Sequence, residues 1–126
     1  MRKFLFVLLL AGCAARQAPA PEAPATPPVP EAPAIRENVA IAGLMQSARD
    51  DAAAGRLLQA AAALERALRI EPRNPRLWNE LARVRLRQGD NAQAAQLAAR
   101  SNSFAGSDAQ LRAANQAIIE QARTQP

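Results

Sequence analysis

The sequence predicts an all-α protein, and three regularities within residues 38–123 indicate it. The segment repeats itself with a period of 34 residues, the length of one helix–turn–helix unit. Glycine stands at the same point of each period, at Gly55 and Gly89, where it supplies the left-handed conformation that ends a helix. Alanines also recur at equivalent positions, so that two helices can approach closely. We therefore expect two helical hairpins followed by a closing helix.

The first twelve residues have the composition of an export signal. Two cations precede an apolar run over residues 4–11, and the tetrapeptide Leu-Ala-Gly-Cys ends the run at Cys13. As a helix, such a run rises roughly 12 Å, well short of the ~30 Å hydrocarbon core, so it is not a membrane span. The motif resembles a bacterial lipoprotein signal, in which residues 1–12 are removed. The alternative is an ordinary secretory leader with a chance cysteine.

This resemblance implies that Cys13 becomes the acylated first residue of the mature protein, with palmitate among its acyl groups. Because alanine rather than aspartate follows Cys13, the same class implies an outer-membrane lipoprotein that faces the periplasm. The lipid anchor would be its only membrane contact, and several acyl chains make such an anchor nearly permanent. Cys13 is the only cysteine, so the mature chain has no free thiol, which suits an oxidising compartment.

Residues 13–37 are predicted to be the lipidated cysteine and a disordered linker rich in proline and alanine. Seven of the ten prolines fall between residues 19 and 33, where they block helix propagation, and nothing here is apolar enough to form a core. An extended spacer of this kind rises ~3.1 Å per residue and reaches at most roughly 70 Å. Two interpretations stay open: a spacer that carries a binding domain towards the peptidoglycan, or a generic linker.

The domain predicted over residues 38–123 matches itself at a shift of 34 residues. The matched pairs are Leu44 with Trp78, Ala48 with Ala82, Arg49 with Arg83, Gly55 with Gly89, Gln59 with Gln93, Ala60 with Ala94, Ala61 with Ala95 and Arg66 with Arg100. Trp78 stands where the tetratricopeptide repeat (TPR) has its first aromatic residue, Gly89 stands at its turn, and Pro72 closes the first repeat. On these residues, about two-thirds of the chain resembles the TPR family. Trp78 is therefore expected to be a core residue.

Five helices are expected, near residues 39–53, 57–71, 75–88, 91–103 and 108–123. Asn74, followed by proline, predicts an N-cap with proline at the first helical position. Asp90 with Gln93, and Ser107 with Gln110, predict capping boxes or close variants. The last helix is apolar on one face and is expected to cap the open end of the array. Two repeats with a cap are fewer than the three that usually give stability.

Composition argues against catalysis and against several kinds of ligand. The mature chain has no histidine, tyrosine, lysine or free cysteine, which removes most nucleophiles and most groups that transfer protons near pH 7. Metal sites built from histidine or cysteine are excluded, and no cofactor is expected. The adjacent carboxylates Asp50 and Asp51 point about 100° apart on a helix and do not converge. With fourteen arginines against eleven acidic residues and only two aromatics, the mature chain is not expected to bind nucleic acid.

The remaining candidate site is a surface. In the TPR family the first helix of each pair lines a concave groove, and this resemblance assigns to it Met45, Arg49, Arg76, Asn79, Arg83, Leu86 and Arg87. The spacing of the arginines in the second repeat places them on one helical face. We expect four guanidiniums to converge above an apolar floor of Met45 and Leu86. Arginine binds carboxylates bidentately, so an acidic loop or C-terminus of a partner is the expected ligand. A solvated arginine-rich face is the alternative.

The order of lipoprotein signal, Pro/Ala spacer and short TPR domain resembles the lipoprotein activators of bifunctional penicillin-binding proteins in pseudomonads and their relatives. The resemblance implies a non-catalytic periplasmic protein that binds a penicillin-binding protein and activates this peptidoglycan synthase. The alternative is a pilotin-like assembly lipoprotein for a secretin or type IV pilus, although known pilotins of this type carry longer arrays. Direct binding of glycan strands is a third option, and the chain offers few aromatics for it.

Overall fold

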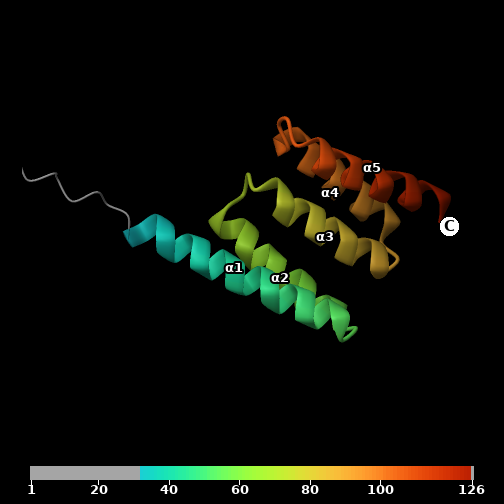
Figure 1. Ribbon diagram of the computed structural model, residues 1–126. Helices are drawn as coiled ribbons and strands as arrows, with labels where there is room; N and C mark the ends of the chain where they lie inside the picture. Colours follow the sequence, from blue (N-terminus) through green and yellow to red (C-terminus); the bar gives the residue numbers. More distant parts are fainter. Residues whose placement is uncertain (1–31, 126) are drawn as a thin grey trace, which may run out of the picture.

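The computed structural model describes residues 32–125, with side chains from residue 39 onward, and five helices fill this range (Figure 1). They are α1 (Ala32–Ala53), α2 (Leu57–Ile70), α3 (Pro75–Arg87), α4 (Asn91–Phe104) and α5 (Ala109–Thr124). The predicted signal, Cys13 and most of the predicted linker lie outside the described residues. Within the described part, no helix is long and apolar enough to cross a membrane.

The helices form two layers. In Figure 1, α1, α3 and α5 lie in front, with α2 and α4 behind them. Each of the pairs α1–α2 and α3–α4 is a closely packed hairpin, while α5 packs against α4 and α3. This arrangement confirms the predicted all-α fold of two helical hairpins and a capping helix.

The core divides into two apolar clusters, one on either side of α3. The first joins α1 and α2 to α3 and contains the fully buried Leu64 and Leu77. The second places Ile118 of α5 against three alanines, Ala82, Ala94 and Ala98, that have no exposed surface. Alanine at these crossings lets neighbouring helices approach at the short end of their packing distances. The expectation that small residues mark the helix crossings is therefore confirmed.

Trp78, the expected core aromatic, is half-buried and packs against the first cluster. Its indole Nε1–H donates to the carbonyl oxygen of Pro72 at 2.8 Å. The guanidinium of Arg100, on α4, lies over its ring at 4.8 Å from the centroid. Trp78 thus joins the loop between the hairpins to α4 and is a packing residue.

The glycine turns and two of the helix N-caps agree with the sequence predictions. Gly55 and Gly89 have φ of 77° and 81°, in the region that other residues rarely adopt. Asn74 is the N-cap of α3, and its side chain accepts a hydrogen bond from the Arg76 N–H at 3.0 Å. Asp90 caps α4 by accepting from the Gln93 N–H at 3.2 Å.

Two helix starts differ from the sequence expectations. The N-cap of α5 is Asp108, whose carboxylate accepts from the Leu111 N–H at 3.0 Å, so the capping box expected at Ser107 is wrong. The positive φ of Gly106 reverses the chain, and the helix then begins one residue later than expected. The start of α1 is Ala32 rather than a residue near 39. Pro33 lies in the first turn, where a helix tolerates proline because the missing N–H has no intrahelical partner there.

Candidate functional site

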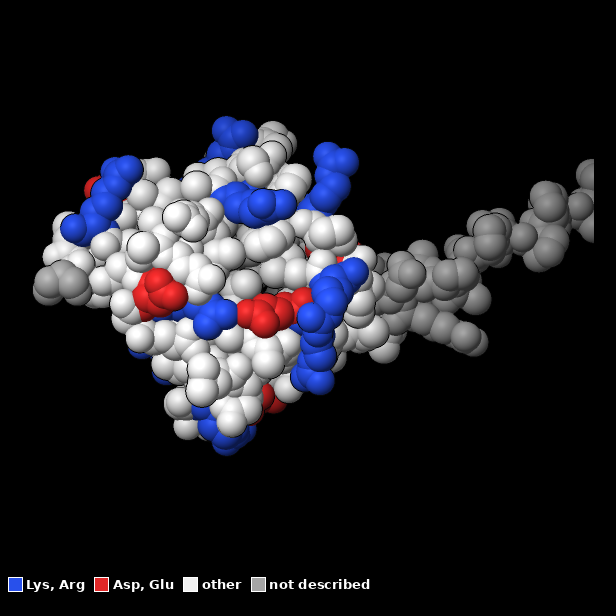
Figure 2. All heavy atoms as spheres, turned by 180° about the vertical axis from the view of Figure 1, so that it is seen from behind, with Lys and Arg blue, Asp and Glu red and all other residues white. Residues whose placement is uncertain are grey.

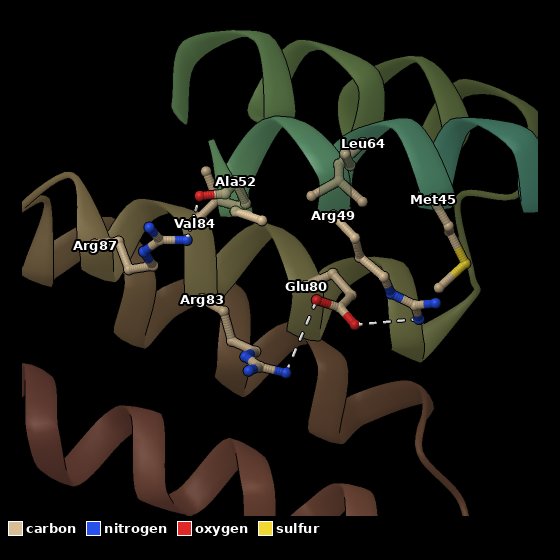
Figure 3. Close-up of a pocket in the computed structure, with 10 residues that line it drawn as sticks. Met45, Arg49, Ala52, Leu64, Glu80, Arg83, Val84 and Arg87 are labelled. Atoms are coloured by element: carbon tan, nitrogen blue, oxygen red, sulfur yellow. Dashed lines mark hydrogen bonds and ion pairs between the residues drawn. The ribbon is translucent and has the colours of Figure 1, made fainter. Parts of the chain in front are cut away.

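A groove runs between α1 and α3, and Leu64 of α2 also lines it (Figure 3). Each of these helices packs chiefly against the partner in its own hairpin, which leaves a hollow of about 310 Å³ between the hairpins. Its floor is apolar and includes Ala48, Ala52, Leu64 and Val84. The hollow therefore has apolar depth between two helical walls. The full lining is Met45, Ala48, Arg49, Ala52, Ala53, Leu64, Glu80, Arg83, Val84 and Arg87.

Two of the predicted arginines meet on a carboxylate at the centre of the groove. Arg49 of α1 lies 3.4 Å from Oε1 of Glu80, and Arg83 of α3 lies 4.0 Å from Oε2 of the same side chain. Figure 3 shows Glu80 between the two guanidiniums. The arginine side chains keep 54% and 64% of their surface exposed, whereas Glu80 keeps 23%. The two walls of the groove are thus joined by a single acid.

Arg87 of α3 donates a hydrogen bond to the backbone of α1, the opposite wall of the groove. Its Nη1 donates to the carbonyl oxygen of Ala52 at 2.8 Å, in the last turn of α1 (Figure 3). Helix α1 has no basic residue of its own in that turn. A cation there stabilises the partial negative charge of the helix C-terminus. Arg87 therefore ties the end of α3 to the end of α1.

Arg76 lies in a second hollow, of about 260 Å³, on the α5 side of the groove. Its guanidinium is 3.9 Å from Asp108, the N-cap of α5. Met45, Arg49 and Glu80 line both hollows, which makes them continuous. The four predicted arginines are thus spread along one surface, and they face two carboxylates. The two hollows together contain four cationic and two anionic side chains, so this surface has a net positive charge.

The packing of α3 places Asn79 and Leu86 outside the hollow between α1 and α3. Asn79 is buried, and its Nδ2 donates to Oδ1 of Asn115 on α5 at 2.7 Å. Leu86 packs against the second core cluster, so it does not form the floor of the groove. Both residues lie seven positions apart on the face of α3 that is turned towards α4 and α5, about 100° from Glu80 and Arg87. The structure brings Met45, Arg49, Arg83 and Arg87 together around the first hollow. Asn79 lines the second hollow, and Leu86 lines neither.

Glu80 is the functional candidate that the sequence analysis missed. It follows Arg76 by four residues and precedes Arg83 by three, so it shares their helical face. That spacing alone could have indicated an acid among the arginines. Its contact with Arg49 comes from another helix, and only the tertiary structure shows it.

Figure 2 shows the molecule from behind, where acidic and basic side chains alternate in a band across the middle of the face and further arginines lie among uncharged residues. Within the described residues, no three histidine, cysteine, aspartate or glutamate side chains come together as a metal site. The groove between α1 and α3 combines an apolar lining with ion pairs that join its two walls.

The fold and this groove define a helical-repeat protein of the kind that binds other proteins on a concave surface. A family model described as tetratricopeptide repeat matches residues 51–118, and the chain belongs to this family. The chain is also similar to a solved structure, the globular C-terminal domain of P. aeruginosa LpoP, at 44% sequence identity and a TM-score of 0.67. That similarity covers 68% of this chain and 80% of the other. No match was found among curated proteins.

Proposed function

We propose that this chain is an outer-membrane lipoprotein that binds a bifunctional penicillin-binding protein in the periplasm and activates its peptidoglycan synthesis. It acts as a non-catalytic partner through its TPR domain. The observation that carries this proposal is the 44% identity to the globular domain of LpoP, since that similarity covers most of both folded domains. The lipoprotein motif at Cys13 and the Pro/Ala spacer give this chain the same order of parts as the activator lipoproteins that it resembles.

The decisive experiment measures glycan polymerisation by a purified penicillin-binding protein from the same cells. Full-length protein in detergent is added, and the rate of polymerisation is expected to rise with its concentration until it saturates. Bovine serum albumin at the same concentration in the same detergent is the control. A rate that stays constant at saturating protein would remove the assignment. Loss of surface pili with intact wall synthesis in a deletion strain would instead favour the pilotin-like alternative.

The anchor is tested separately, because the proposed location depends on it. Cys13→Ser removes the only thiol and hence the acylation site. We expect wild-type protein to sediment with outer membranes and to carry the mass of its acyl groups, and the variant to be released in soluble form. A wild-type protein without acyl mass would contradict the proposed anchor, whatever the outcome of the polymerisation assay.

A further inference from the structure

Glu80 is the carboxylate that lies between the two arginines of the groove. One of its oxygens faces Arg49 of α1 and the other faces Arg83 of α3, so a single carboxylate bridges the two walls of the groove. Both arginine side chains remain more than half exposed. Arginine donates through several N–H groups, and each of these side chains has donors to spare for a second acceptor. The place is accessible to a partner.

The contacts of Glu80 are long compared with the two shortest ion pairs of the described residues. Its distances to the two arginines are 3.4 and 4.0 Å. The pairs Arg85–Glu65 and Arg56–Asp51 instead close to 2.7 Å, which is the range of a well-formed charge-assisted hydrogen bond. Long, half-exposed ion pairs contribute little to stability, so exchange of one carboxylate for another costs little.

A displaced Glu80 has another partner within reach. Arg76 lies four residues earlier on the same face of α3, and both residues line the hollow next to α5. The present contact of Arg76, with Asp108, is 3.9 Å long, and its side chain is 73% exposed. Rotation of Glu80 towards Arg76 would free Arg49 and Arg83 without leaving the acid unpaired.

The floor of the groove defines the second half of the ligand. Ala48, Leu64 and Val84 line it but are almost fully buried, so the apolar surface that remains open comes from the partly exposed Met45, Ala52 and Ala53. Short alanine side chains leave room there for an aliphatic side chain from another molecule. Burial of such a side chain is favourable in proportion to the apolar area removed from water.

We propose that Glu80 stands in for a carboxylate of the protein partner. The groove between α1 and α3 binds a partner segment in which an acidic group adjoins an aliphatic side chain. The acidic group takes the place of Glu80 between Arg49 and Arg83, while the aliphatic side chain enters the hollow above Leu64 and Val84. This inference rests on the proposed function, which supplies a protein partner, and it names the chemistry that the partner presents.

The test uses full-length protein in detergent and a fluorescein-labelled hexapeptide in which leucine and glutamate alternate. A second peptide replaces each glutamate with glutamine. Fluorescence anisotropy is expected to give binding of the glutamate peptide that is about tenfold tighter than that of the glutamine peptide. Arg49→Gln and Arg83→Gln should each weaken binding by about fivefold, whereas Glu80→Gln should strengthen it by about threefold, since the internal competitor is gone. Arg66→Gln, an equal change of charge at an exposed site on α2 outside the groove, should leave the affinity within about twofold.

The sign of the Glu80→Gln effect decides the inference. Weaker binding would mean that Glu80 orients the two arginines, and the stand-in role would be wrong. Equal binding of the two peptides, or of all the variants, would also overturn it. The same variants in the polymerisation assay separate this inference from the proposed function. If both arginine variants still stimulate polymerisation, the groove is not the binding site, but the proposed function stands. If the peptides bind as expected and wild-type protein does not stimulate polymerisation, the groove binds such a segment, but the proposed function is wrong.

Discussion

Asn115 has no exposed surface and makes three hydrogen bonds. Its Oδ1 accepts from Asn79, and its Nδ2 donates to Ser101 and Asn102, at distances of 2.7–2.8 Å. Ser101 in turn donates to the carbonyl oxygen of Pro75 at 2.7 Å. Three helices are thus joined by one buried polar network, in which every amide atom of Asn115 has a partner. Such a network fixes the position of α5 more specifically than apolar packing does.

Replacement of Asn115 by alanine should therefore destabilise the domain strongly. The change leaves the buried Nδ2 of Asn79 without its acceptor and removes the donor to Ser101, and each buried group that loses its partner costs about 1–3 kcal/mol. We expect Asn115→Ala to lower the free energy of unfolding by about 2–4 kcal/mol, measured by urea denaturation.

The neighbouring Gln116→Ala is the control for this measurement. Gln116 is exposed and bonds only to Glu120, one turn later, among the described contacts. Its loss should change the free energy of unfolding by less than about 0.5 kcal/mol. Equal effects of the two substitutions would show that the buried network does not stabilise the fold.

At the scale of the helices, their ends are determined by local chemistry and their positions by packing. Gly89 ends α3 with φ of 81°, and the side chain of Asp90 then begins α4. A salt bridge of 2.7 Å between Arg85 and Glu65 joins α3 to α2, across the two repeats. The groove exists because α3 packs on α2 and α4, while α1 approaches α3 mainly through side chains that line the hollow.

Substitution of Gly89 and Gly43 by alanine tests the effect of backbone conformation on stability without a change in packing. A Cβ at Gly89 or at Gly43 would meet no atom within 4 Å, so neither substitution creates a clash. Gly89→Ala forces a left-handed conformation on alanine and should destabilise the domain by about 1–2 kcal/mol. Gly43 lies inside α1, and Gly43→Ala should stabilise the domain by about 0.5–1 kcal/mol, because glycine weakens a helix interior. Thermal unfolding of both variants checks the pair, and effects of the same sign would contradict the assignment of the turn.

The whole molecule is proposed to combine a membrane anchor, a spacer and a binding domain. Since α1 already begins at Ala32, a fully extended spacer over residues 14–31 would reach roughly 55 Å at ~3.1 Å per residue. In the proposed function this distance brings the groove from the outer membrane towards a synthase of the inner membrane. The folded part is small and is closed at its C-terminal end by α5, whose outward face is polar.

Deletion of residues 17–30 tests this geometry. The change shortens the reach by about 40 Å but retains Cys13 and all five helices. Purified in detergent, the shortened protein should stimulate polymerisation as well as wild-type protein does. In cells it should fail to complement a deletion strain. The same deletion combined with Cys13→Ser should restore function, because a released domain needs no reach, and failure of this double variant would contradict a role for length.

The sequence by itself determined which segments are helices and how they are paired. Three features can be recognised in the sequence because they are local or evenly spaced. They are the period of 34 residues, the glycines at its turns and the buried alanines. The N-cap of α5 lies one residue after the predicted position, and α1 begins about two turns before its predicted start. In both places a single residue, Gly106 or Pro33, is compatible with more than one helix boundary.

Only the tertiary structure decided what the groove contains. Arg49 and Glu80 are separated by 31 residues, and their contact depends on how the two hairpins pack. The same packing turned Leu86 towards the second core cluster and Asn79 towards Asn115 on the α5 side, since one residue along α3 corresponds to a rotation of 100°. Periodicity indicates that residues share a helical face, but the face that meets another helix is chosen by the fit of all the helices together.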